Sequence, residues 1–98
     1  MTGSIYFFQS EKTPDGPVKI GYTSRRLRRR QTELQVSNHE TLILLVDVTG
    51  TLEDETSLHR IFKEYQIRGE WFQYAPTIQD LVFHLVEGGG LQSWLESQ

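Results

Sequence analysis

The segment SIYFFQSEKTPDGPVKIGY (residues 4–22) decides the fold of this chain. Ile5 to Phe8 are good strand formers, and Val18 to Tyr22 alternate apolar and polar side chains as a half-buried strand does. Between these runs, TPDGP (residues 13–17) has the composition of a turn, because proline fixes φ and glycine tolerates a positive φ. The segment therefore predicts a β-hairpin.

Alternation along this hairpin separates its side chains into two faces. The apolar side chains predicted to share one face are Ile5, Phe7, Val18 and Ile20. The opposite face receives Tyr6, Lys19 and Gly21. A nearby ammonium favours the phenolate form of a tyrosine, so Lys19 is expected to lower the pKa of Tyr6, which is about 10 in a free side chain. The alternative is that Tyr6 simply packs and Lys19 is solvated.

The remaining elements follow from caps and periodicity. Thr23 or Ser24 is expected to cap a helix that begins near Arg25. A strand is predicted over Thr41–Val48, followed by a helix that opens with a capping box of Thr51 and Asp54. A further helix is predicted over Thr77–Val86, and a short amphipathic segment contains Leu91, Trp94 and Leu95. These last two elements place C-terminal helices over residues 77–97. Gly69-Glu70-Trp71-Phe72 is predicted to be a turn followed by two core anchors.

Length and composition limit the possible classes. A chain of 98 residues suits a single domain over residues 1–98. It contains no cysteine, which excludes disulfides and cysteine-containing zinc sites. The longest apolar run, Leu42 to Val46, is too short to span a membrane, and no basic segment precedes Ile5 as it would in a signal peptide. These features predict a cytoplasmic protein without a membrane partner.

Charge is distributed unevenly along the chain. Residues 1–32 hold seven Lys/Arg and two Asp/Glu, whereas residues 33–98 hold three and eleven. The cations concentrated in the six positions from 25 to 30 are Arg25, Arg26, Arg28, Arg29 and Arg30. A local positive patch on an acidic body is expected where a protein holds phosphates in one place. The alternative is a solvated helix face.

Glu55 is the most informative residue of the helix that follows Thr51. It lies three residues before Leu58 and seven before Phe62, on the apolar stripe of that helix. A carboxylate turned toward a core is costly unless it meets a cation or a metal, although helix starts also favour acidic residues through the macrodipole. His59, one turn later, shares this face and is predicted to be a hydrogen-bonding neighbour and not a zinc ligand.

Four blocks in order resemble the GIY-YIG nuclease superfamily, and more narrowly its short branch in phage open reading frames and the meiotically up-regulated gene family. The blocks, after Ser4-Ile5-Tyr6, are VKIGYT (18–23), RLRRRQT (26–32), ETSLHRIF (55–62) and GEWF (69–72). The similarity covers residues 4–72. Serine replaces the first glycine of the superfamily motif, and lysine replaces the first tyrosine of its second half, as is usual in this branch.

The resemblance implies an α/β (α+β) fold, with a small three-stranded antiparallel sheet flanked by helices. It also implies hydrolysis of phosphodiester bonds in nucleic acid, mainly DNA, with a single divalent cation, Mg²⁺ or Mn²⁺. By position, Tyr6 would be the general base or its relay, supported by Lys19. Arg26 would steady the scissile phosphate, although Arg28 and Arg29 are alternatives because the link after Gly21 is short. Glu55 would be the only protein ligand of the metal.

Three functional hypotheses follow. The first is a metal-dependent endonuclease in which Tyr6, Lys19, Arg26, Glu55 and His59 form the catalytic group. In it, the nucleic-acid contacts come from Arg25, Arg28, Arg29 and Arg30. The second is a non-catalytic nucleic-acid or nucleotide binding module that retains the fold. The third, a structural interaction domain, leaves the arginine cluster and the inward Glu55 without an explanation.

Overall fold

The computed structural model describes residues 2–36 and 40–98. In chain order its elements are β1 (Gly3–Ser10), β2 (Val18–Thr23), α1 (Leu27–Val36), β3 (Leu42–Gly50), α2 (Leu52–Ile61), a 3₁₀ turn (Lys63–Tyr65), β4 (Gln66–Arg68), β5 (Trp71–Phe72), α3 (Pro76–Val86) and α4 (Leu91–Glu96). Among these residues, no helix has the length and hydropathy that a membrane span requires.

The sheet has five strands in the order β3-β1-β2-β5-β4, and every neighbouring pair is antiparallel. The α+β class with flanking helices is confirmed, but the expected strand number of three is wrong. The additional strands β4 and β5 have three and two residues. Strands of two and three residues hold a single period of the two-residue alternation, too little to form a pattern, so the sequence indicates only the turn and the anchors that follow it.

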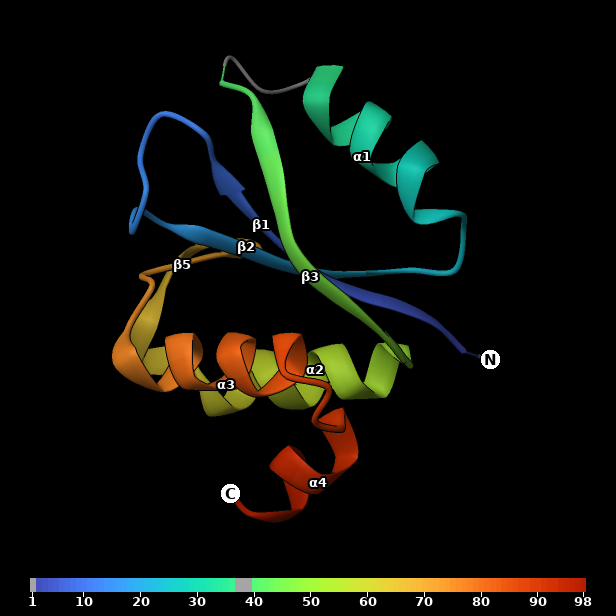
Figure 1. Ribbon diagram of the computed structural model, residues 1–98, viewed down its shortest axis with the longest axis vertical. Coiled ribbons are helices and arrows are strands. Elements are labelled where there is room, and N and C mark those ends of the chain that lie inside the picture. Colours follow the sequence, from blue (N-terminus) through green and yellow to red (C-terminus); the bar gives the residue numbers. More distant parts are fainter. Residues whose placement is uncertain (1, 37–39) are drawn as a thin grey trace.

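Helices cover both faces of the sheet (Figure 1), with α1 on one side and α2 and α3 on the other. The hairpin alternation is confirmed. The side chains that pack with α2 and α3 include Ile5, Phe7, Val18, Ile20 and Phe72. The smaller cluster beneath α1 consists of Tyr6, Phe8, Leu34 and Leu42 with Leu27, Leu44 and Trp71 at its margin. β1 therefore contributes side chains to both clusters, whereas β2 contributes its apolar side chains to the larger one.

Two local predictions about helix starts have different outcomes. The capping box of α2 is confirmed, because Thr51 Oγ1 accepts from the Asp54 N–H at 3.1 Å and Asp54 Oδ2 accepts from the Thr51 N–H at 3.0 Å. In contrast, α1 begins at Leu27, two residues later than expected. The Thr23 hydroxyl instead accepts from the Arg25 N–H at 3.1 Å and shapes the link before the helix.

The anchor prediction for residues 71 and 72 is confirmed for Phe72, which is fully buried. Trp71 is half-buried and packs at the margin of the smaller cluster. The Lys19 ammonium lies over its ring, with Nζ 5.2 Å from the ring centroid. One side of the indole is thus covered by a cation and another by the core.

Candidate functional site

The candidate site lies where β2 runs past the end of β5. The pairing of β5 with β2 covers only Val18 and Lys19. Beyond this pair, the main chain of β2 meets other partners along the same edge. The Ile20 N–H donates to the Glu70 carbonyl at 2.9 Å, and the Ile20 carbonyl contacts His59 Nε2 at 2.9 Å. The Tyr22 N–H donates to the carboxylate of Glu55.

Because β2 is not paired with β5 beyond Lys19, side chains of α2 can reach past this open edge to the face of the sheet that α1 covers. Glu55 and His59 are one turn apart on α2, and each uses its side chain to satisfy a main-chain group of β2. A carbonyl oxygen only accepts hydrogen bonds, so Nε2 of His59 carries a hydrogen in this contact. The His59 ring also packs edge-on against Phe72, at 4.9 Å between centroids. His59 thus makes a hydrogen bond next to Glu55, as expected, and its partner is the Ile20 carbonyl.

Tyr6 is fully buried on the α1 side, and its hydroxyl has two partners. It donates to Glu70 Oε1 at 3.0 Å and accepts from Arg30 Nε at 3.3 Å. Gly21 makes this contact possible, because a Cβ at that position would collide with the Tyr6 hydroxyl and ring and with the Glu70 carboxylate. Gly21 lies directly opposite Tyr6 in the hairpin. The absent side chain provides the space in which phenol and carboxylate meet.

The expectation that Lys19 lowers the pKa of Tyr6 is wrong. Burial, together with the negative charge of Glu70, raises the pKa of Tyr6 to about 12, against the opposing hydrogen bond from Arg30. Lys19 does not offset this, since its Nζ lies 3.8 Å from Glu70 Oε1 and over Trp71. The ammonium therefore interacts with the carboxylate and the indole, and Tyr6 is a neutral phenol at pH 7.

The structure brings Arg30, and not Arg26, to Tyr6. Arg26 is exposed in the link before α1, and its carbonyl accepts from the N–H groups of Arg29 and Arg30. Arg30 lies between Leu27 and Leu34 on the inward stripe of α1, so its guanidinium points toward the sheet. The spacing of Leu27, Arg30 and Leu34 is a signal that could have identified Arg30 from the sequence.

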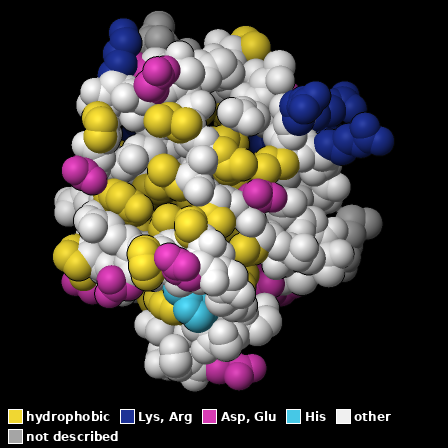
Figure 2. Space-filling model, in the orientation of Figure 1, with side chains coloured by type: hydrophobic (Ala, Val, Ile, Leu, Met, Phe, Trp, Pro, Cys, Tyr) yellow, Lys and Arg dark blue, Asp and Glu magenta, His cyan; other side chains and the backbone are white. Residues whose placement is uncertain are grey.

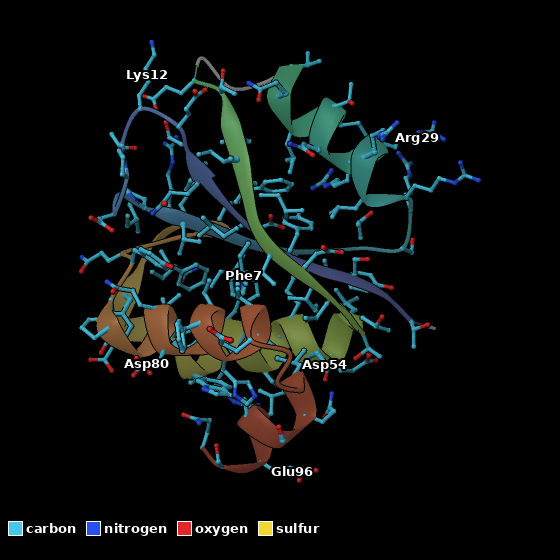
Figure 3. The ribbon with its side chains drawn as sticks, viewed as in Figure 1. Phe7, Lys12, Arg29, Asp54, Asp80 and Glu96 are labelled. Atoms are coloured by element: carbon cyan, nitrogen blue, oxygen red, sulfur yellow. The ribbon has the colours of Figure 1, made fainter. Side chains whose placement is uncertain are left out.

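Two of the other arginines, Arg25 and Arg29, form an exposed group around Glu33. Its Oε1 pairs with Arg25 Nη1 at 2.7 Å and Arg29 Nε at 3.9 Å, while its Oε2 lies 3.8 Å from Arg30 Nη1. Figure 2 shows a dense group of basic side chains at the upper right of the visible face and a separate basic side chain at the upper left, and Figure 3 shows Arg29 projecting away from the body. A hollow of about 260 Å³ between this group and Tyr22 is lined by Tyr22, Thr23, Ser24, Arg25, Arg30 and Glu33.

Glu55 has the environment of a potential cation ligand. Its carboxyl is half-buried, and burial raises its pKa, as does the charge of Glu70, while His59, the Tyr22 N–H and Arg30 act in the opposite direction. The ion pairs of the described residues do not include it. Within residues 2–36 and 40–98, no three or more His, Cys, Asp or Glu side chains gather as a metal-binding group.

A single carboxylate is compatible with Mg²⁺ or Mn²⁺ of the kind that keeps several waters and binds substrate phosphates. It does not fit a closed structural zinc site. Of the predicted residues, Tyr6, Lys19, Glu55 and His59 thus meet along β2, whereas Arg25, Arg26, Arg28 and Arg29 lie outside the group. The residue that sequence reasoning missed is Glu70, which it had placed only in a turn.

Comparison with known proteins identifies one family. The T5orf172 domain model matches residues 3–87, which include every strand and the first three helices. No curated protein and no solved structure matches the chain. The T5orf172 domain occurs in phage open reading frames and is related to GIY-YIG-like nucleases. With most of its length covered by that match, this chain belongs to the T5orf172 domain family.

Proposed function

We propose that this chain is an endonuclease that hydrolyses phosphodiester bonds in nucleic acid, principally DNA, with one divalent cation, Mg²⁺ or Mn²⁺, in the cytoplasm. The observation that carries the proposal is the grouping of Tyr6, Arg30 and Glu70 with Glu55 on the open edge of β2. A phenol, a guanidinium and a carboxylate supply a proton path, an anion contact and a cation ligand. Phosphodiester hydrolysis requires these three functions.

Each side chain has a distinct task in this scheme. Arg30 reaches Tyr6 through Nε, and its terminal nitrogens can contact a phosphate oxygen and neutralise charge that grows on the phosphate during attack. Tyr6 orients the attacking water through its hydroxyl. His59 fixes the position of Ile20 and therefore of Gly21, beside which Tyr6 lies. Glu55 would hold the cation, and a bound cation would supply positive charge to the phosphate and the leaving oxygen.

Exposed arginines supply affinity in this proposal. Arg25 lines the hollow beside Arg30, and Arg28 and Arg29 are exposed on α1, while residues 33–98 are strongly acidic. Phosphates of the bound strand are therefore attracted to this corner and repelled elsewhere. Glu33 competes for two of these guanidinium groups, so binding of a phosphate replaces one anion by another.

A second candidate is a binding module that holds nucleic acid without cutting it. The observation that favours it is the neutral Tyr6, because a phenol with a pKa of about 12 is a weak base at pH 7. In this case the arginines bind the backbone, and the Tyr6–Glu70 contact only orders the hairpin.

The test is incubation of the purified chain with supercoiled plasmid in Mg²⁺, in Mn²⁺ and in EDTA. The endonuclease predicts nicked and then linear DNA in the presence of metal, a large loss of cleavage in Tyr6→Phe, and normal cleavage in Tyr74→Phe, a matched control outside the site. Fluorescence anisotropy with a labelled duplex is measured in parallel. Binding without metal-dependent cleavage by the wild type would replace the endonuclease with the binding module.

A further inference from the structure

The position of Glu70 has a consequence for proton transfer at this site. The Tyr6 hydroxyl is buried between Arg30 and Glu70, and as a neutral phenol it must lose its own proton in order to accept another. The acceptor of its hydrogen bond is Glu70 Oε1, at 3.0 Å. The two residues are 64 positions apart in sequence, so the contact exists only in the folded chain.

We propose that Glu70 is the terminal proton acceptor of the site and acts through Tyr6. This inference rests on the proposed phosphodiester hydrolysis. The Tyr6 hydroxyl receives a proton from water while its own proton moves to Glu70 Oε1. Arg30 donates to the same hydroxyl from the other side, at 3.3 Å, so the oxygen keeps a donor throughout the transfer.

Bonds and protons balance in this step. A bond forms between the water oxygen and phosphorus, and the bond between phosphorus and the leaving oxygen breaks. One proton of the water passes to Tyr6 Oη, and the Tyr6 proton passes to Glu70. The leaving oxygen takes a proton from solvent, and Glu70 later returns its proton to solvent. Water is the only co-reactant.

The surroundings hold Glu70 in the position that this relay needs. Its side chain extends over Gly21, where any side chain would displace it. The Lys19 ammonium lies 3.8 Å from the same Oε1, and the main-chain carbonyl of Glu70 accepts from the Ile20 N–H at 2.9 Å. The Glu70 side chain is 26% exposed, so water reaches the carboxylate and can carry the proton away.

Substitution by glutamine separates proton transfer from positioning. In Glu70→Gln, the amide oxygen still accepts the hydrogen bond of Tyr6, but an amide does not take up its proton. If Glu70 is the proton acceptor, kcat of Glu70→Gln falls by about 10²-fold or more, the usual worth of a general base, with an unchanged KM for DNA. Glu70→Asp, which keeps a carboxylate on a shorter side chain, recovers part of the loss. Glu64→Gln, at an exposed position, is the matched control.

The relative activities of Glu70→Gln and Glu70→Asp decide whether Glu70 is a proton acceptor or a structural residue. A merely structural Glu70 predicts that the isosteric glutamine is at least as active as aspartate, and this order would overturn the proposal. The double variant Tyr6→Phe with Glu70→Gln should be no slower than Tyr6→Phe alone, because residues on one proton path act as a unit. Losses that multiply would overturn it as well. Melting curves and anisotropy confirm that each variant folds and binds.

Failure of the hydrolysis proposal is distinguishable from failure of this one. A wild type that does not cleave DNA in Mg²⁺ or Mn²⁺ overturns both. A wild type that cleaves, beside a Glu70→Gln variant that cleaves equally fast, overturns the role of Glu70 and leaves the endonuclease in place.

Discussion

Replacement of Glu55 by glutamine should separate folding from cation binding. Glutamine keeps the volume of the side chain and can still accept from the Tyr22 N–H, but it carries no charge. Burial raises the pKa of Glu55 in the folded protein, so the folded state binds its proton more tightly than the unfolded chain. The stability contributed by the protonated form is present at low pH and is lost as pH rises through the folded pKa. Glu55→Gln should therefore melt at least as high as the wild type at pH 7.5, and this advantage should vanish near pH 4.

In the presence of Mn²⁺, the wild type should instead gain stability relative to Glu55→Gln. A ligand that binds only the folded state stabilises it by RT ln(1 + [L]/Kd), which is about 1.4 kcal/mol at a Mn²⁺ concentration of ten times Kd. For a domain of this size, 1 kcal/mol shifts Tm by roughly 4–8 °C. The wild type should therefore gain about 6–11 °C at that concentration, and Glu55→Gln should gain almost nothing.

The assay is thermal melting under a Mn²⁺ titration at constant ionic strength, together with plasmid nicking by the same samples. Glu64→Gln, which removes an exposed carboxylate, should follow the wild type in both experiments. Nicking by Glu55→Gln should fall by about 10²-fold or more, at every metal concentration. An equal Mn²⁺-dependent rise of Tm in wild type and Glu55→Gln would refute Glu55 as the cation ligand, as would an unchanged nicking rate.

Three further predictions concern other parts of the chain. Gly21→Ala should displace the Tyr6 ring, lower stability by about 1–3 kcal/mol in urea denaturation and abolish nicking, and a fully active variant would contradict the close approach of Tyr6 to Gly21. The double variant Arg28→Ala with Arg29→Ala should flatten the slope of log K against log salt by about 0.9 for each phosphate that is no longer bound, measured by anisotropy, and an unchanged slope would mark a solvated face. Trp71→Ala should cost about 3 kcal/mol, near the lower limit for aromatic truncation because the ring is only half-buried, and an unchanged urea midpoint would remove it from the core.

The hairpin and the start of α2 were predictable because local spacing determines both. Alternation with a period of two assigned Phe7 and Tyr6 to opposite faces, and each packs in the expected cluster. The capping box needs only a threonine and an aspartate three positions apart, and the observed hydrogen bonds follow from that spacing. The same helical spacing turned Glu55 inward, where it is half-buried.

The parts that were missed depend on long-range contacts. β5 has two residues and is a strand because β2 and β4 lie beside it, which no local pattern indicates. Glu70 acquires its partner from β1, far away in sequence. The ionisation of Tyr6 depends on burial and on which carboxylate is nearest, so the proximity of Lys19 in the hairpin gave the wrong direction. Arg30 could have been predicted from its place on the apolar stripe of α1, but the position of Arg26 in the family motif favoured Arg26 instead.

The shortness of β5 is what makes the candidate site possible. If β5 continued along β2, the main-chain groups of Ile20 and Tyr22 would pair with a strand, as those of antiparallel neighbours do. His59 and Glu55 would then have no place at that edge, and both would have to leave the sheet or lie buried without partners. Because β5 ends and Gly21 has no side chain, residues from α2 on one face and from α1 on the other meet across a single strand. The site is therefore an opening in the sheet, and its chemistry depends on strand length as much as on the residues that surround it.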